Sequence, residues 1–495
     1  MNRELRTFEN QKLSKCLEEN INLFNKIFEK DAVFRMRKIN VSGEEQFTCI
    51  VMFVDGMVNS QIINESIIKA LIENKIKNTQ KDLIEYAEHQ LLYANEISKT
   101  NIVSDVLSGI LYGDTALIID GCDSALVINT KGWRTRGISE PEDERVLSGP
   151  REGFDEALML NLAMLRRKLP TPDLCVEMLK CGRKTDTKIF VCYIDSLVKQ
   201  ENVEKIKREI SKIDIDGILD SNYLDELINK NKISLFKTMG TTERPDVVVA
   251  KLLEGRIAIM VDGTPVVITV PYLYAENFQS DDDYYQNFLV AGIGRTLRYI
   301  SYYLSICLPA LYIALSVFNP QLLPTNFLRT ISESRADIPF STFGESLVLV
   351  LIFEILKEVG IRMQQSVGHA MSIVGGLVVG QAAVEANIVS APLLIITAFS
   401  GITGLMVPRL KGANFYCKII LLIFSSVLGL FGFFIGLTLI QVHLYSLDSL
   451  DVNYTTLGYK FQKTSLKDTF VRTAWDHMKN RPSSLTANLR RLRKR

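Results

Sequence analysis

Residues 367–385 carry the side chains whose types and spacing could do chemistry in this chain. Their sequence, VGHAMSIVGGLVVGQAAVE, offers two faces of one helix. One face has a small residue at every fourth position, which lets helices pack closely in lipid. The other begins with apolar side chains and ends with an amide and a carboxylate, an order that a gated ion path could use. The packing face comprises Gly368, Ser372, Gly376 and Gly380, and the candidate pore face comprises Met371, Val374, Val378, Gln381 and Glu385. A helix buried inside the bundle of one subunit could show the same pattern.

A second group of candidate residues is charged and lies just before this helix. Glu354 lies within an apolar run, and Lys357, Glu358 and Arg362 follow closely. Ionisable groups at such depth rarely face lipid. The pattern therefore fits a buried ion network that couples subunits, and it fits equally well a cluster of charges at the membrane edge.

The remaining reactive residue types form no recognisable catalytic or metal-binding motif. Eight cysteines are scattered without Cys-x-x-Cys or Cys/His ligand spacing, and the four histidines lie far apart. No G-x-S-x-G, H-E-x-x-H or G-x-x-x-x-G-K-[ST] pattern occurs. We therefore expect reduced thiols, no metal, no cofactor and no enzymatic activity. With a net charge of +1, we also expect no nucleic-acid partner.

Two similar segments precede the apolar part of the chain. FTCIVMFVDGM (47–57) and TKIFVCYIDSLV (187–198) each place an apolar strand before an aspartate. TALIIDGCDSALVI and IAIMVDGTPVVITV each read as strand, Asp-Gly turn and strand. The offsets are 140 residues between Asp55 and Asp195 and 142 between Asp120 and Asp262, which predicts tandem copies of one α/β unit. Asp-Gly is mostly hairpin chemistry, so we assign these turns no ligand.

The fold class that follows is a tandem pair of cytosolic α/β subdomains, an α-helical polytopic membrane domain and a short basic cytosolic tail. The opening residues carry no secretory signal pattern, so we expect the first part to stay cytosolic. The expected segments are a helical lead-in (1–45), the first α/β subdomain (46–135), a linker and helix (136–180), the second α/β subdomain (181–286), the membrane domain (287–445) and the tail (446–495).

Five apolar runs make up the membrane domain, at 299–318, 340–356, 367–385, 388–407 and 419–442. The tail has eleven Lys and Arg against four Asp, which places it in the cytoplasm. If both ends are cytoplasmic, the number of crossings is even, so five runs pose a parity problem. Either one run is re-entrant or partial, or one hides two short segments. We favour 340–356 as the incomplete run and expect about four full spans.

Several stretches resemble one family, the A subunits of GerA-type spore germinant receptors. They are DGMVNSQIINESIIKAL, DGCDSALVINTKGWRTRGISEPEDERVLSGPREGFDEAL, the membrane stretch from NPQLLPTNFLRTISESRADIPF to VEANIVSAPLLII, and the closing LKDTFVRTAWDHMKNRP. The resemblance covers about 45–482 and leaves out the first forty residues and the basic extreme C-terminus.

The resemblance implies a multi-pass protein of the spore inner membrane that triggers germination in response to nutrients. Such a subunit acts with a transporter-like B subunit, with which germinant recognition is associated, and with a lipoprotein C subunit. Its copies would assemble as a ring around a cation pore. Two other functions stay open from the residues alone, a secondary transporter and a non-conducting scaffold for the receptor complex. Transporters typically repeat their membrane halves, and these five runs show no such repeat.

Overall fold

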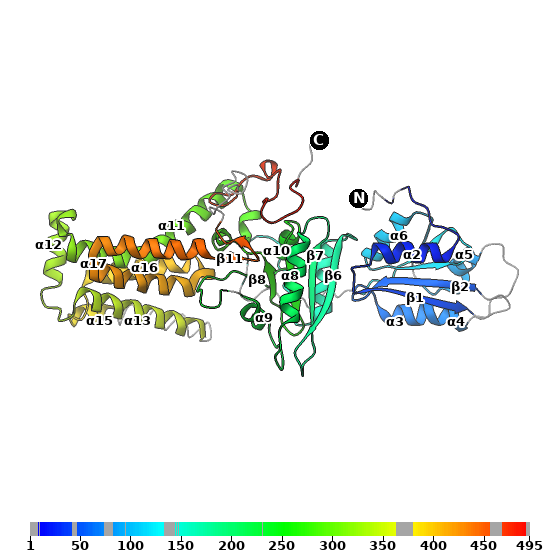
Figure 1. The fold of residues 1–495 in the computed structure, drawn as a ribbon, viewed down its shortest axis with the longest axis horizontal. Helices are drawn as coiled ribbons and strands as arrows, with labels where there is room; N and C mark the ends of the chain where they lie inside the picture. The colour runs from blue at the N-terminus through cyan, green and yellow to red at the C-terminus, as the bar shows by residue number, and fades with distance from the viewer. Residues whose placement is uncertain are drawn as a thin grey trace. The chain divides into compact units, whose positions relative to one another are not determined.

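The computed structural model divides into two compact units (Figure 1). The first comprises Met1–Lys230, Met239–Pro271 and Lys479–Arg495, and the second comprises Asn231–Thr238 and Tyr272–Met478. The structure describes residues 8, 10–41, 47–73, 83–94, 96–132, 144, 146, 148–229, 231–362, 380–455 and 468–491, with only the backbone at 83, 361 and 362.

The first unit contains two α/β subdomains built from the same elements in the same order. The first has α2 (Leu17–Ile27), β1 (Phe34–Val41), β2 (Phe47–Val54), α3 (Ser60–Ile62), η1 (Ile63–Ile68), α4 (Lys69–Glu73), α5 (Leu83–Tyr86), η2 (Ala87–Leu91), β3 (Ile97–Thr100), α6 (Val103–Leu111), β4 (Thr115–Ile119) and β5 (Ala125–Ile128). The second has α7 (Leu158–Lys168), β6 (Leu174–Cys181), β7 (Thr187–Ile194), α8 (Gln200–Ser211), α9 (Ser221–Ile228), β8 (Gly240–Thr242), α10 (Pro245–Leu252), β9 (Ile257–Val261) and β10 (Val267–Val270).

The two sheets have equivalent strand orders, β1-β2-β4-β5-β3 and β6-β7-β9-β10-β8, and all the neighbouring pairs are antiparallel. The register repeats as well, because Cys49 pairs with Ile119 in the first sheet. In the second sheet the residues 140 and 142 positions further along, Ile189 and Val261, form the equivalent pair. Strands β2 and β7 begin 140 residues apart, and β4 and β9 begin 142 apart. The predicted tandem repeat is therefore confirmed.

Two strands correct the expected segment limits. We expected residues 1–45 to be a helical lead-in, but β1 lies there and pairs with β2 along its whole length. Four of the eight residues of β1 (FRMRKINV) are exposed, because this strand forms an edge of the sheet. Likewise β6 begins at Leu174, within the 136–180 segment expected to be linker and helix, and α7 occupies the place in the second copy that α2 has in the first.

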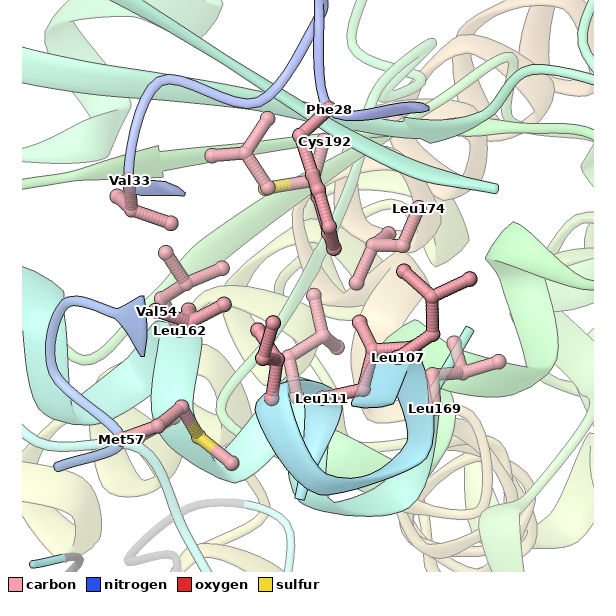
Figure 2. Packing of buried hydrophobic residues seen from close by; sticks show 14 of the residues in the cluster. Phe28, Val33, Val54, Met57, Leu107, Leu111, Leu162, Leu169, Leu174 and Cys192 are labelled. Atoms are coloured by element: carbon pink, nitrogen blue, oxygen red, sulfur yellow. The ribbon is translucent and has the colours of Figure 1, made fainter. Parts of the chain in front are cut away.

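The central strands are buried on both faces. In the first sheet, Ile50 and Met52 face the cluster that includes α2 and α6, whereas Cys49 and Val51 face Ile63 and Ile67 on the opposite side. This explains their continuous apolar sequence. One buried cluster joins both copies (Figure 2). It contains Phe28, Leu107 and Leu111 from the first copy and Leu162, Leu174 and Cys192 from the second.

The second unit is mainly helical. Its elements are η3 (Tyr274–Phe278), η4 (Asp281–Tyr284), α11 (Phe288–Ile313), η5 (Ala314–Phe318), η6 (Pro320–Leu322), α12 (Thr325–Ser334), α13 (Thr342–Arg362), α15 (Gly380–Glu385), α16 (Ala391–Leu405), η8 (Pro408–Leu410), α17 (Lys411–Ser446), β11 (Asp448–Ser449), β12 (Val452–Asn453) and η9 (Trp475–His477). Among the described residues, Phe288–Phe318 and Pro408–Ser446 are long and apolar enough to cross a membrane, and Ala391–Leu405 is a shorter apolar helix.

α17 reverses direction at Gly429. This residue has φ 57° and ψ −137°, outside the helical region, a conformation that glycine adopts at little cost. A Cβ at Gly436 would lie 3.1 Å from Leu421 Cδ2, although residues fifteen apart in a straight helix are separated by about 22 Å. Residues 411–428 and 430–446 therefore pack side by side as a helical hairpin, with Phe318 against the turn.

The hairpin bears directly on the parity problem. The run 419–442 hides two short segments, which is one of the two solutions considered. The run 340–356, which we favoured as incomplete, is instead part of the continuous 21-residue helix α13. At 1.5 Å per residue α13 is about 32 Å long, close to the thickness of a bilayer core. Length alone therefore does not make this run incomplete. Among the described residues, however, α13 is not one of the helices that are both long and apolar enough to cross a membrane, so the assignment of 340–356 as the incomplete run stays a prediction.

The end of the chain is also more structured than a free basic tail. Residues from Lys479 onward belong to the first unit. There Thr486 Oγ1 donates a hydrogen bond to the Leu197 carbonyl oxygen at 2.7 Å, and Lys199 Nζ donates one to the Ser484 carbonyl oxygen at 2.6 Å. The last described residues thus pack on the second α/β subdomain.

Candidate functional site

The end of the candidate pore helix lies within the described chain. Gly380 faces α16, where a Cβ on it would lie 3.6 Å from Leu394 Cδ2, an ordinary van der Waals contact. Gln381 and Glu385 are exposed one turn apart, and Gln381 Nε2 donates a hydrogen bond to Glu385 Oε1 at 2.9 Å. The other members of the two predicted faces lie outside the described residues, namely Gly368, Met371, Ser372, Val374, Gly376 and Val378.

The charged residues of α13 form separate pairs. Lys357 Nζ lies 2.7 Å from Glu354 Oε2, and Lys411 Nζ, at the start of α17, lies 3.0 Å from Glu358 Oε2. The side chain of Arg362 lies outside the described residues. The Glu358–Lys411 pair joins α13 to α17 within one chain, across 53 residues of sequence.

Glu345 is a buried carboxylate near the start of the apolar run 340–356. It lies in the first turn of α13 and is 1% exposed. Glu345 Oε1 accepts hydrogen bonds from the backbone N–H of Ser390 and from Ser390 Oγ, the latter at 2.5 Å. Since Ser390 is the N-cap of α16, this carboxylate binds the free N–H end of a second helix, where negative charge is stabilised. The guanidinium of Arg335 lies 3.7 Å away.

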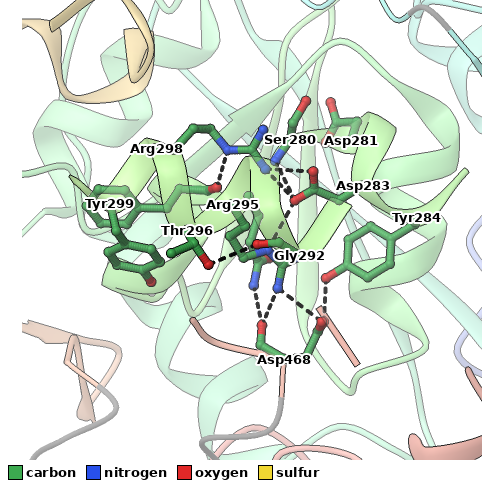
Figure 3. A network of polar contacts seen from close by, with 12 residues as sticks. Ser280, Asp281, Asp283, Tyr284, Gly292, Arg295, Thr296, Arg298, Tyr299 and Asp468 are labelled. Atoms are coloured by element: carbon green, nitrogen blue, oxygen red, sulfur yellow. Dashed lines mark hydrogen bonds and ion pairs between the residues drawn. The ribbon is translucent and has the colours of Figure 1, made fainter. Parts of the chain in front are cut away.

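A polar network of the second unit lies where the chain enters α11 (Figure 3). Arg295 is fully buried, and its Nε donates a hydrogen bond to Asp283 Oδ2 at 3.1 Å. Its Nη1 donates to Asp468, reaching the carbonyl oxygen at 2.5 Å and Oδ1 at 3.0 Å. Arg298 Nη2 lies 2.6 Å from both oxygens of Asp283, and Tyr284 donates to Asp468 Oδ2 at 2.7 Å.

This network connects three segments that lie far apart in the sequence. Asp283 is in the acidic turn η4, the arginines are in α11, and Asp468 is the third residue of the closing stretch quoted above as LKDTFVRTAWDHMKNRP. Arg409 adds a contact by donating to the carbonyl oxygens of Glu276 at 3.2 Å and Gln279 at 3.3 Å. The three consecutive acids and the two arginines were visible in the sequence, but their pairing with Asp468 was not.

These groups can position helices, hold charge and line polar surfaces. Within the described ranges, no group of three or more His, Cys, Asp or Glu residues is arranged to hold a metal ion.

Comparisons with known proteins agree with the sequence resemblance. Residues 22–484 match the family model described as Bacillus/Clostridium GerA spore germination protein. The chain is 37% identical over 454 residues to spore germination protein KA of Bacillus subtilis (strain 168), covering 91% of this chain and 83% of that protein. It is 35% identical over 486 residues to the uncharacterized membrane protein YfkQ of the same organism, covering 97% and 94%.

One solved structure is also similar. It is the crystal structure of the N-terminal domain of the A subunit of the Bacillus megaterium spore germinant receptor GerK3. The identity is 30%, the match covers 53% of this chain and 98% of that domain, and the TM-score is 0.39.

Proposed function

The chain belongs to the Bacillus/Clostridium GerA spore germination protein family, and from this premise we propose that it is the A-type membrane subunit of a nutrient-responsive germinant receptor. The observation that carries the proposal is the family match over residues 22–484, together with a named spore germination protein at 37% identity. The receptor would sit in the spore inner membrane and trigger germination.

The arrangement of the chain supports a membrane subunit with both ends on one side. The apolar helices Phe288–Phe318 and Pro408–Ser446 would lie in the bilayer. The last described residues pack on the second α/β subdomain through Leu197 and Lys199, so these two parts must share a side of the membrane. The positive charge of the tail favours the cytoplasmic side, which is the spore core.

We further propose that copies of the chain assemble around a nutrient-gated cation pore. Met371, Val374 and Val378 would form the apolar constriction, and Gln381 and Glu385 would form a mouth that favours cations. The exposure of the Gln381–Glu385 pair, on a helix whose Gly380 packs against Leu394, supports this assignment. These two polar side chains are free to face water or a neighbouring copy.

The partners we propose are the transporter-like B subunit and the lipoprotein C subunit implied by the family resemblance. The nutrient would bind through the B subunit. In this arrangement the A subunit converts the partner's state into pore opening, and the Glu354–Lys357 pair, which is 19–24% exposed, lies on a helix that could respond to a neighbouring copy.

Conductance of the purified full-length chain in planar bilayers tests the proposal. A channel subunit should form discrete cation-selective openings that depend on its oligomer. A secondary transporter should instead give slow, saturable flux without unitary steps, and a scaffold should give neither. Chemical cross-linking of the same sample reports whether oligomers are present, so that absence of current in an assembled oligomer contradicts the channel.

A further inference from the structure

The beginning of α11 and residues 468–478, which we call the closing segment, together form an apolar groove on the second unit. The groove has a volume of about 380 Å³ and is lined by Phe288, Leu289, Gly292, Ile293, Thr296, Leu297, Val471 and Arg472. The side chains of Leu289 and Ile293 are 62% and 64% exposed. Gly292 makes room for the closing segment, because a Cβ there would lie 3.0 Å from Val471 Cγ1.

Arg472 is a buried cation at this groove with no carboxylate partner among the described residues. It is 4% exposed, and its Nε has no hydrogen-bond partner. Its guanidinium lies 5.5 Å from the ring centre of Tyr284 and 5.7 Å from that of Trp475. The nearby carboxylate of Asp468 is engaged by Arg295 and Tyr284. Because burial of a charge without a counter-ion is unfavourable, this guanidinium is suited to a bound anion.

The length of the helix that carries the groove allows the groove to lie at the level of the lipid headgroups. Phe288–Phe318 spans 31 residues, about 47 Å at 1.5 Å per residue, so it exceeds a hydrocarbon core of about 30 Å. Its first turns must therefore lie near the membrane surface if the rest crosses. Exposed Tyr285 precedes α11 in the chain, and exposed Trp475 lies against Tyr284 with 5.9 Å between the ring centres. Tyrosine and tryptophan are enriched at membrane interfaces.

We propose that this groove binds an anionic phospholipid, with an acyl chain along Leu289, Ile293 and Val471 and the phosphate against Arg472. The apolar lining is continuous with a helix of membrane-spanning length. The guanidinium of Arg472, whose Nε has no hydrogen-bond partner, complements a lipid phosphate. This site rests on insertion of α11 in the membrane and not on pore formation. It would make the seating of the closing segment on α11 depend on the lipid composition.

Fluorescence quenching of Trp475 tests this site in the full-length chain. The chain has two tryptophans, and Trp133→Phe leaves Trp475 as the only emitter. The protein is reconstituted in phosphatidylcholine vesicles that contain either brominated phosphatidylglycerol or brominated phosphatidylcholine. Half-maximal quenching by brominated phosphatidylglycerol should need a mole fraction about fivefold lower than that of brominated phosphatidylcholine. A fivefold preference is about the size expected from the attraction of one arginine to an anionic lipid surface.

The variants decide between the possible outcomes. Arg472→Gln should abolish the preference for phosphatidylglycerol, whereas Arg329→Gln, at an exposed arginine of α12, should keep it. Ile293→Ser changes only an exposed groove residue and should reduce quenching by phosphatidylglycerol even if Arg472→Gln proves poorly folded. Equal quenching by the two lipids, or a preference that survives in both Arg472→Gln and Ile293→Ser, overturns the proposal. Loss of the preference on addition of soluble glycerol phosphate overturns it in favour of a site for free anions.

Discussion

The carboxylate of Asp262 accepts a hydrogen bond from the backbone N–H of Leu158, at 3.3 Å and across 104 residues. Leu158 is the first residue of α7, and the equivalent contact in the first copy joins Asp120 to Leu17 at 3.2 Å. In each copy, the glycine that follows the aspartate also donates to a backbone oxygen just before the helix. The two Asp-Gly turns therefore hold the free N–H ends of α2 and α7 on their sheets.

Removal of this cap should destabilise the second α/β subdomain. We expect Asp262→Ala to lower the free energy of unfolding by about 0.5–2 kcal/mol, the usual cost of a lost helix N-cap. Asp120→Ala should do the same in the first copy. Chemical denaturation followed by circular dichroism measures the change. Asp123→Ala is the control, since this exposed aspartate lies in the hairpin of Asp120 and, among the described residues, accepts a side-chain hydrogen bond from Ser124 alone. Equal stability of Asp262→Ala and Asp123→Ala would show that the cap contributes nothing.

Breaking the buried ion pair between Asp31 and Arg166 should lower the free energy of unfolding more than removing the helix cap does. These side chains are 4% and 1% exposed and join the two copies. Asp31→Asn leaves a buried guanidinium without its counter-ion, and we expect a loss of about 3–5 kcal/mol in unfolding free energy. A double replacement by apolar residues, Asp31→Leu with Arg166→Met, should recover much of that loss.

The adjacent exposed pair provides the comparison. Lys30 and Asp195 lie 2.7 Å apart with 45% and 40% of their side chains exposed. Lys30→Gln should cost no more than about 1 kcal/mol. A loss as large as that of Asp31→Asn would contradict the role of burial in the pair.

Buried thiols should make the first unit sensitive to alkaline pH. Burial raises the pKa of Cys192 to about 12, whereas an unfolded thiol releases its proton near pH 8.5. Between these values only the unfolded chain has lost the proton. The unfolding free energy should therefore fall as pH rises from about 9 to 12, by about 1.4 kcal/mol per pH unit for this thiol.

Denaturation at several pH values measures this slope. Cys192→Ala should reduce the fall in unfolding free energy by about 1.4 kcal/mol per pH unit, whatever the variant does to stability at neutral pH. Burial raises the pKa of Cys49 and Cys175 to about 12 as well, so part of the slope should remain. Cys16→Ala, at an exposed position, is the control. An unchanged slope in Cys192→Ala would refute the assignment.

The network around Arg295 should control how firmly the closing segment is held. Asp283→Asn leaves Arg295 and Arg298 facing a neutral amide, so the contacts to Asp468 should weaken. Hydrogen exchange at the backbone N–H of Thr473, which donates to Asp468 Oδ1 at 3.2 Å, should accelerate by at least about tenfold. Asp337→Asn, at an exposed position of the same unit, should leave that exchange rate as in the wild type. Unchanged exchange in Asp283→Asn would separate this acid from the closing segment.

The proposed pore face predicts two different phenotypes. Val374→Ala and Val378→Ala should leak cations without germinant, because a wider apolar constriction holds water more readily. Glu385→Gln should reduce cation selectivity at the mouth, whereas Glu333→Gln, an exposed acid on α12, should not. Reversal potentials in bilayers and ion release from spores check these expectations. Assembled variants that behave as the wild type would remove these residues from the pore.

The sequence alone determined the features that depend on local chemistry. Strand, Asp-Gly turn and strand recur at offsets of 140 and 142 residues, and the structure repeats the same order of elements at those offsets. The edge strand β1 was missed because it alternates apolar and charged residues within a short stretch that otherwise reads as helix. Its period of two was the signal available.

Only the tertiary structure decided which distant groups meet. Arg295 and Asp468 are 173 residues apart, and nothing in the spacing of either indicates the other. Nor does the sequence indicate that Glu345 binds Ser390, 45 residues away. The reversal at Gly429 was also hidden, because the sequence around it is one continuous apolar run. Hydrophobic periodicity reports which residues leave water, but it does not specify the partner of a buried charge. That partner is decided by packing, because a buried ion is stable only where folding brings a counter-charge or a helix end within bonding distance.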